Sequence, residues 1–222
     1  MKLTELTGQV ETHLTRLNKH TLIHQGVLSP FIALQGAASE AGFDLQIASG
    51  FRSFERQQLI WNNKYSGKTT LLNKEEFPIS FSSLSELERL LAILHWSALP
   101  GASRHHWGTD FDIYDPSLLP KDKQLQLTCD EYQEGGYFFK LNQWLSDNMH
   151  RYGFYRPYQV YQGGVAAEPW HISYQPIADH CLQQLTITCI RNTLLKNNIL
   201  GKHLIFQHLP MIYEQYICNI NS

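Results

Sequence analysis

The mixture of long amphipathic helical segments with a few short strand-like segments constrains the fold of this chain most strongly. Apolar side chains form a single stripe over residues 84–99, which is typical of a helix packed on a core. Related patterns predict two more helices and three short strands, over residues 31–41, 138–149, 43–48, 111–114 and 170–174. The strands and helices do not alternate as they do in a parallel sheet, so the sequence predicts an α+β fold.

Caps and breakers mark the boundaries of several predicted segments. Ser29 followed by Pro30 predicts the start of the helix over residues 31–41. Ser53 can cap the N-terminus of a further helix. Two polar segments are predicted to lack regular secondary structure: a loop over residues 67–82 and a longer irregular segment over residues 116–136.

The chain length and the absence of linkers predict one domain. A chain of 222 residues can bury one sizeable core, and no repeat or Pro/Gly/Ser-rich stretch divides it. We therefore predict a single domain over residues 1–222, with its polar motifs in residues 47–174 and a mostly helical extension over residues 175–222. Within that extension, residues 185–190 (LTITCI) could instead be extended.

Charge and apolar runs exclude several classes of partner. The formal net charge is −2 and basic residues do not cluster, which argues against binding to nucleic acid. Residues 1–17 contain no apolar run of about seven residues, so we expect neither a secretory signal nor insertion into a membrane. We expect a cytoplasmic protein, or a periplasmic one if an upstream segment has been removed.

The cysteines fit no CxxC pattern. A helix through Cys181 and Cys189 would place both on one face with Leu185 between them. We predict that all four cysteines are buried thiols without disulfides, namely Cys129, Cys181, Cys189 and Cys218.

Three short segments concentrate polar groups beside aromatic residues and glycine. They are residues 49–53 (SGFRS), 103–112 (SRHHWGTDFD) and 168–171 (EPWH). Each lies next to a predicted strand, and the ends of strands are where a rigid scaffold presents functional side chains. These segments therefore contain the candidate site.

A catalytic zinc ion needs three nitrogen or oxygen ligands from the protein and an open position. His105, Asp112 and His171 supply two imidazoles and one carboxylate, and Gly108 lets the backbone turn between the first two. These side chains converge if the strands that carry Asp112 and His171 are neighbours. We predict one zinc ion per chain at these ligands.

Two neighbouring residues leave alternatives open. Asp110 shares a strand face with Asp112, so it could support a ligand or exchange roles with Asp112. His106 is an alternative ligand to His105 on chemical grounds.

Glu168 and Arg52 are the candidates for catalysis. Pro169 biases Glu168 away from helical geometry, which could aim its carboxylate at the water that zinc activates. A carboxylate in reach can take a proton from that water and deliver it to the leaving amine. The Arg52 guanidinium can bind a substrate carboxylate with two hydrogen bonds or stabilise an oxyanion, and the first role implies a carboxypeptidase.

These motifs resemble those of the zinc D-alanyl-D-alanine carboxypeptidases of the vancomycin-resistance type. That group also includes lysostaphin-type enzymes and the hedgehog signalling domain. The resemblance extends over about residues 47–174 and rests on three ordered motifs: Ser-Gly-Phe-Arg52-Ser, Ser103-x-His105-x-x-Gly108-x-x-x-Asp112 and Glu168-Pro-Trp-His171. At the position of Asp110, such relatives commonly carry a small apolar residue.

The resemblance implies a small antiparallel sheet that carries zinc and is flanked by helices. It implies three zinc ligands, His105, Asp112 and His171. It implies that Glu168 is the catalytic base, that Arg52 polarises the scissile carbonyl or holds the substrate, and that Ser103 binds the terminal carboxylate. The implied substrates are peptidoglycan stem peptides or their precursors, which end in D-alanine.

The sequence thus predicts a zinc carboxypeptidase that releases terminal D-alanine, with either D,D- or L,D-specificity. Two alternatives remain: a peptidoglycan endopeptidase with the same zinc chemistry, and a non-catalytic zinc-binding module. Glu168 favours an enzyme, because structural zinc needs no base. The sequence does not predict an oligomeric state.

Overall fold

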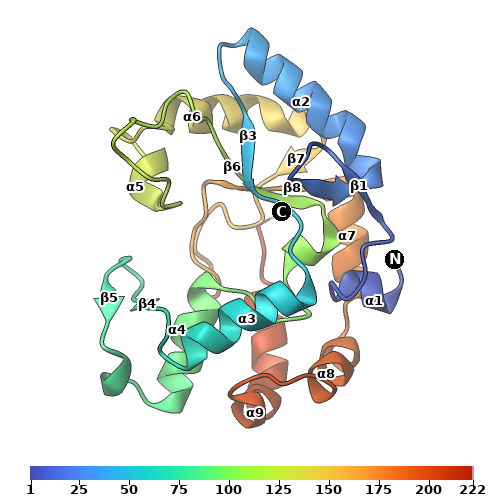
Figure 1. Cartoon of the computed structure of the whole chain (residues 1–222), viewed down its shortest axis with the longest axis vertical. Coiled ribbons are helices and arrows are strands. Elements are labelled where there is room, and N and C mark those ends of the chain that lie inside the picture. Colours follow the sequence, from blue (N-terminus) through green and yellow to red (C-terminus); the bar gives the residue numbers. More distant parts are fainter. Residues whose placement is uncertain (222) are drawn as a thin grey trace.

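A four-stranded antiparallel sheet lies at the middle of the computed structural model, which describes residues 1–221 (Figure 1). The strands of the described chain, in this sheet and outside it, are β1 (Leu14–Arg16), β2 (Leu22–His24), β3 (Gln46–Ser49), β4 (Leu71–Leu72), β5 (Pro78–Ile79), β6 (Asp110–Tyr114), β7 (Phe154–Tyr155) and β8 (His171–Tyr174). The central sheet has the order β3-β6-β8-β7, while β1 with β2 and β4 with β5 form two separate hairpins.

Nine α-helices within residues 1–221 surround this sheet. They are α1 (Leu3–Leu6), α2 (Leu28–Glu40), α3 (Phe54–Tyr65), α4 (Glu86–Trp96), α5 (Cys129–Tyr132), α6 (Phe139–Asn148), α7 (Gln175–Gln184), α8 (Ile187–Leu195) and α9 (Lys202–Ile212). In Figure 1, α2 and α6 lie on one side of the sheet, and α3, α4, α8 and α9 lie on the other side. The predicted α+β class is confirmed.

Alternation along β6 separates its apolar face from its polar face. Phe111 and Ile113 are fully buried and pack with α2 and α6, where the ring centroids of Phe31 and Phe111 lie 5.2 Å apart. Asp110 and Asp112 therefore point to the opposite face of the sheet. One short strand thus supplies both the core and the polar site.

A second apolar cluster joins the helices on the polar side of the sheet. Its large buried side chains come from α3, α4, α8 and α9, and include Trp61, Leu90, Leu194 and Ile205. Trp61 also donates from Nε1 to the carbonyl of Leu200 at 3.0 Å. This cluster fixes α3 and α4 opposite the polar face of β6.

The local signals around Ser53 and Ser29 had different outcomes. Ser53 caps α3 as predicted, since its Oγ accepts a hydrogen bond from the backbone N–H of Arg56 at 3.2 Å. The prediction that the next helix upstream starts after Ser29 and Pro30 was wrong, because α2 already begins at Leu28. Proline is tolerated in the first turn of a helix, where its missing N–H leaves no bond unmade.

Two segments predicted without regular structure contain short elements. The polar segment 67–82 includes the β4–β5 hairpin, and residues 116–136 include α5. The N-terminal β1–β2 hairpin, which gave no clear periodic signal, was not predicted. Short strands of this kind leave too few residues for a pattern to develop.

Of the two predictions for the C-terminal extension, the helical one is confirmed for the described residues. The extension is mostly helical up to Asn221, and Ser222 lies outside the described residues. Residues 187–190 are helical, because Thr186 Oγ1 caps α8 by accepting from the Cys189 N–H at 3.2 Å; only Leu185 and Thr186, which join α7 to α8, have extended backbone. The extent of the single domain over residues 1–222 stays a prediction.

The prediction of four buried thiols holds only for Cys181. Cys129 and Cys189 are partly buried and Cys218 is exposed, and all four are free. The chain bends between α7 and α8, so Cys181 and Cys189 do not share a continuous helix face. Among residues 1–221, no helix has the length and apolar character that crossing a membrane requires.

We expect Gly108→Ala to destabilise the protein by at least about 2 kcal/mol, because Gly108 adopts a left-handed φ of 67°. A Cβ there would also meet the backbone nitrogen of His24 at 2.8 Å. Gly36→Ala is the matched control: Gly36 lies on the exposed face of α2, where an added Cβ meets nothing within 4 Å. That variant should gain about 0.5–1 kcal/mol. Urea unfolding measures both, and equal stability of the two variants would contradict this account of the turn.

Candidate metal centre

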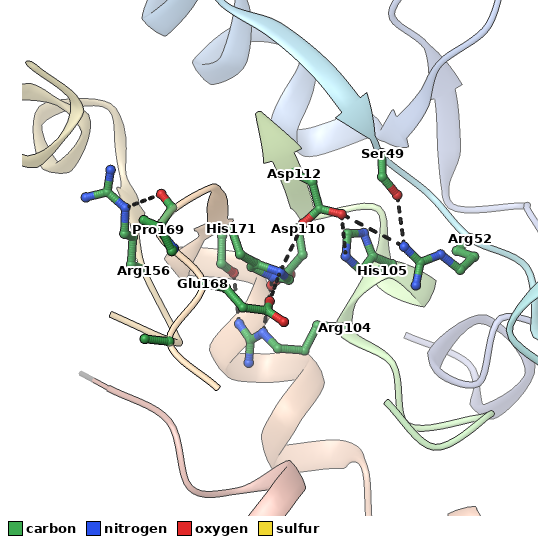
Figure 2. Close-up of polar contacts among 12 residues, drawn as sticks. Ser49, Arg52, Arg104, His105, Asp110, Asp112, Arg156, Glu168, Pro169 and His171 are labelled. Atoms are coloured by element: carbon green, nitrogen blue, oxygen red, sulfur yellow. Dashed lines mark hydrogen bonds and ion pairs between the residues drawn. The ribbon is translucent and has the colours of Figure 1, made fainter. Parts of the chain in front are cut away.

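Three candidate ligands meet on the polar face of the sheet (Figure 2). Asp112 lies on β6 directly opposite His171 on β8, and His105 comes from the 3₁₀ turn Arg104–Trp107 that precedes β6. One ligand atom from each residue lies within 4.8 Å of the others. The Asp112 carboxylate is 3.5 Å from His105 Nε2 and 3.4 Å from His171 Nδ1. The condition set by the sequence, that the two strands are adjacent, is met.

A backbone contact fixes the orientation of His105. Its Nδ1 lies 2.9 Å from the carbonyl oxygen of Gly50, which can only accept, so Nδ1 carries the proton. Nε2 then keeps a free lone pair directed toward Asp112. Burial outweighs the opposing charge of Asp112 and lowers the pKa of His105 to about 4, so the ring is neutral at pH 7. A neutral imidazole is the form that binds metal.

His171 has one occupied nitrogen and one without a partner. Nε2 donates to Asp110 Oδ1 at 3.0 Å. Nδ1 is buried and has no hydrogen-bond partner among residues 1–221, although it lies 3.2 Å from a Glu168 oxygen. Burial alone would lower the pKa of His171, but Asp110, Asp112 and Glu168 raise it well above its usual value. This concentration of negative charge favours a cation at Nδ1.

Asp110 supports His171 and does not join the ligand cluster. It is fully buried, and Oδ1 also accepts from Arg104 Nε at 2.7 Å while Oδ2 accepts from Thr109 Oγ1 at 2.6 Å. Burial raises the pKa of Asp110, but Arg104 and His171 outweigh burial and hold that pKa well below its usual range. The carboxylate is therefore ionised, and its oxygens are already engaged with neighbours.

His106 points away from the cluster, so the alternative in which it replaces His105 finds no support. Its Nδ1 lies 2.6 Å from the carbonyl oxygen of Arg52, and its Nε2 accepts from the Gly101 N–H at 3.0 Å. Both nitrogens of the fully buried ring are thus occupied. His106 fixes the backbone beside Arg52.

Glu168 lies at the rim of the ligand cluster (Figure 2). The turn through Pro169 closes with a hydrogen bond from the His171 N–H to the Glu168 carbonyl at 3.0 Å, which brings the two side chains together. Burial, and then the charge of Asp112, raise the pKa of Glu168 against the opposing effect of His171. A carboxylate with a raised pKa is suited to exchange protons near neutral pH.

Arg52 is aimed at the same place from the other side. Its guanidinium donates to Ser49 Oγ at 3.0 Å and to Gln57 Oε1 at 2.9 Å, and it lies 3.9 Å from Asp112. Ser103 is buried, and its Oγ has no hydrogen-bond partner in the part of the chain that the structure describes. Both side chains therefore have donors available for a further group.

All the predicted site residues line one cavity of about 280 Å³. They are His105, Asp112, His171, Glu168, Arg52 and Ser103. The donor set of two imidazole nitrogens and a carboxylate, with an unpartnered buried nitrogen among them, fits a catalytic zinc ion that keeps an open position.

Sequence reasoning missed the residues that support this cavity. Gln57 orients Arg52, and Arg104 neutralises Asp110. Arg156 donates from Nε to the Pro169 carbonyl at 2.9 Å and so holds the turn after Glu168 (Figure 2). Gln57 lies close to Arg52 in the chain, but Arg156 belongs to no motif, so no local signal could have identified it.

Asp110→Asn should weaken zinc binding by about 10- to 100-fold, because loss of this charge leaves His171 less well oriented and less basic. Competition with a chromophoric chelator measures the dissociation constant of zinc. Asp147→Asn, on the exposed side of α6, is the control and should bind zinc as the parent protein does. Unchanged zinc affinity in Asp110→Asn would contradict a supporting role for Asp110.

Comparison with known sequences shows the family. The family model VanY, D-alanyl-D-alanine carboxypeptidase, matches residues 20–177. An uncharacterized protein of Haemophilus influenzae is 43% identical over 121 residues, which cover 54% of this chain and 92% of that protein. The D-alanyl-D-alanine carboxypeptidase of Enterococcus faecalis is 29% identical over 151 residues; these cover 66% of this chain and less than half (46%) of that relative.

Solved structures share the fold. VanYB in complex with D-alanine-D-alanine superposes with a TM-score of 0.56 at 23% identity, covering 86% of this chain and 92% of that one. A VanY D,D-pentapeptidase in complex with Zn(II) gives 0.52 at 24% identity, with 77% and 84% coverage. The LdcB LD-carboxypeptidase gives 0.51 at 24% identity, with 78% and 69% coverage. The family match, the shared fold and the candidate zinc site together show that this chain is a metallopeptidase of the VanY family of D-alanyl-D-alanine carboxypeptidases.

Proposed function

We propose that this protein is a zinc carboxypeptidase that removes the terminal D-alanine from peptidoglycan-type peptides. The observation that carries the proposal is the cluster of His105, Asp112 and His171, which shares one cavity with Glu168 and Arg52. Two relatives support it: a VanY enzyme was solved with Zn(II), and VanYB was solved with D-alanine-D-alanine. Relatives of both D,D- and L,D-type have this fold, so the proposal covers either specificity.

His105 Nε2, an Asp112 oxygen and His171 Nδ1 would hold one zinc ion per chain. When bound, zinc supplies a Lewis acid that polarises a carbonyl and lowers the pKa of water from about 16 to roughly 7. Asp110 keeps His171 in the tautomer that leaves Nδ1 free for this purpose.

Glu168 is the proposed general base. Its carboxylate lies beside the cluster, and burial raises its pKa toward the range in which it can both accept and return a proton. Glu168 would take a proton from the attacking water at a carboxylate oxygen. It would then deliver that proton to the amine of the departing D-alanine.

Arg52 and Ser103 are the proposed substrate-binding groups. Gln57 and Ser49 hold the Arg52 guanidinium in place, which lowers the entropy lost when it binds an oxyanion or a carboxylate. Ser103 Oγ, which is buried without a partner in the described structure, can donate to a terminal carboxylate. A site of this kind favours a carboxypeptidase over an endopeptidase, which would need an open cleft.

Glu168→Ala should lower the rate of D-alanine release by about 10²- to 10⁴-fold and still bind zinc, because Glu168 is a base and not a ligand. His171→Ala should lose most of its zinc. The measurements are D-alanine release from a peptide ending in D-Ala-D-Ala and metal content by mass spectrometry. A chelator should abolish turnover by the parent protein. Full zinc without turnover in the parent protein would support the non-catalytic module, and turnover that survives both chelation and Glu168→Ala would refute the mechanism.

Amidation of the peptide C-terminus should reduce kcat/KM by about 10-fold or more, because the charge-assisted bonds to the terminal carboxylate are lost. The comparison uses the same peptide with a free and with an amidated terminus. Equal cleavage of both peptides would instead identify an endopeptidase.

A further inference from the structure

Lys64 places a second cationic side chain on the wall of the same cavity. It lies on α3, seven residues after Gln57 and therefore about two turns farther along the same helix face. Gln57 accepts a hydrogen bond from Arg52. One face of α3 therefore carries Gln57, which holds the first cation, and then Lys64, which is the second. The motifs that identify the family do not include Lys64.

The Lys64 ammonium has a hydrogen bond but no carboxylate paired with it in the described residues. Its Nζ donates to Ser97 Oγ at 2.7 Å, and it forms no ion pair within residues 1–221. The side chain is partly buried, and burial lowers the pKa of Lys64 against the opposing charge of Glu168. A cation withdrawn from water without a counter-charge destabilises a protein. Such a group is better satisfied when an anion enters the cavity.

The surroundings of Lys64 are fixed and offer further donors. Gln57 Nε2 donates to the Ala98 carbonyl at 2.7 Å, which holds the Ser97–Ala98 turn against α3. Ser97, Ala98 and Ser103 all line the cavity with Lys64, and Ser103 Oγ has no partner in the described structure. The two acids of the cavity, Asp112 and Glu168, approach His171 at the metal site, and neither forms an ion pair with Lys64, although the charge of Glu168 acts on it.

We infer that Lys64, held in place by Ser97, binds a carboxylate of the peptide substrate in this cavity. The inference rests on the proposed function, because a peptide that ends near the zinc ligands brings its carboxylates into the same space. An ammonium on a flexible stem suits this role, since it accepts an anion from several directions. Two carboxylates can serve: the terminal one of D-alanine, and the one on the side chain of a diaminopimelate residue farther along the peptide.

The test compares Lys64→Met, which removes the charge and keeps the length, with Lys64→Arg, which keeps the charge. Lys68→Met is the matched control, because Lys68 is exposed just beyond the end of α3. Two N-acetylated tripeptides ending in D-Ala-D-Ala serve as probes. One begins with acetylated lysine and has only the terminal carboxylate, and the other begins with diaminopimelate and has a second carboxylate. Readouts are kcat/KM for D-alanine release and, independently of turnover, calorimetric binding in the Glu168→Ala background.

We expect Lys64→Met to lose about 10- to 100-fold in kcat/KM and in affinity, with melting temperature and zinc content unchanged. Lys64→Arg should retain most of the binding, and Lys68→Met all of it. Loss with both probes would assign Lys64 to the terminal carboxylate, and loss with the diaminopimelate probe alone would assign it to the side-chain carboxylate.

Four results would overturn the inference or separate it from the proposed function. Parent-like values for Lys64→Met with both probes would refute it while D-alanine release stands. A lowered melting temperature of Lys64→Met, together with equally weakened substrate binding in Lys64→Arg, would show that Lys64 is only a structural contact of Ser97. Binding without turnover in the parent protein would refute the proposed function alone, because the calorimetric comparison still tests Lys64; no binding at all would refute both.

Discussion

The antiparallel pairing of β6 with β8 is the constraint on which the whole site depends. This pairing places Asp112 opposite His171, and a slip of β8 by one residue would turn His171 to the apolar face while Asp112 stayed on the polar one. The register is secured from that apolar face, because Phe111, Ile113 and Ile172 are fully buried against α2 and α6. The packing of the core therefore determines where the candidate zinc ligands meet.

Charge balance around His171 is the second requirement. Asp110, Asp112 and Glu168 approach one imidazole; Arg104 pairs closely with Asp110 at 2.7 Å, whereas Arg52 lies 3.9 Å from Asp112. The remaining negative charge is concentrated around the unpartnered Nδ1, which is where a divalent cation would be most stabilised. The counter-ion of Asp110, Arg104, comes from the turn that also carries His105. Because Arg104 balances the charge of Asp110 in this buried ion pair, Asp110 adds little net negative charge at the position of the metal.

The convergence of the candidate site residues was easier to predict from the sequence than the elements around them. His105, Asp112, His171, Glu168, Arg52 and Ser103 lie in short motifs, and the structure brings all of them to one cavity. The roles of Asp110 and His106 could not be separated from sequence, because they depend on which neighbour each side chain faces after folding. Lys64 and Arg156 act on residues distant in the chain and leave no local pattern. The start of α2 depends on the 3₁₀ turn Gln25–Val27 that leads directly into it, and the helical state of residues 187–190 depends on the Thr186 cap; both outweigh intrinsic preference.

The most direct test of this account is a crystal structure of the zinc-loaded protein with anomalous diffraction recorded at the zinc edge. The account predicts one strong peak about 2.0–2.2 Å from His105 Nε2, an Asp112 oxygen and His171 Nδ1, with Glu168 beside the remaining open position. A peak bound by His106 or Asp110 in place of these ligands, or a fourth protein ligand that closes the open position, would contradict it.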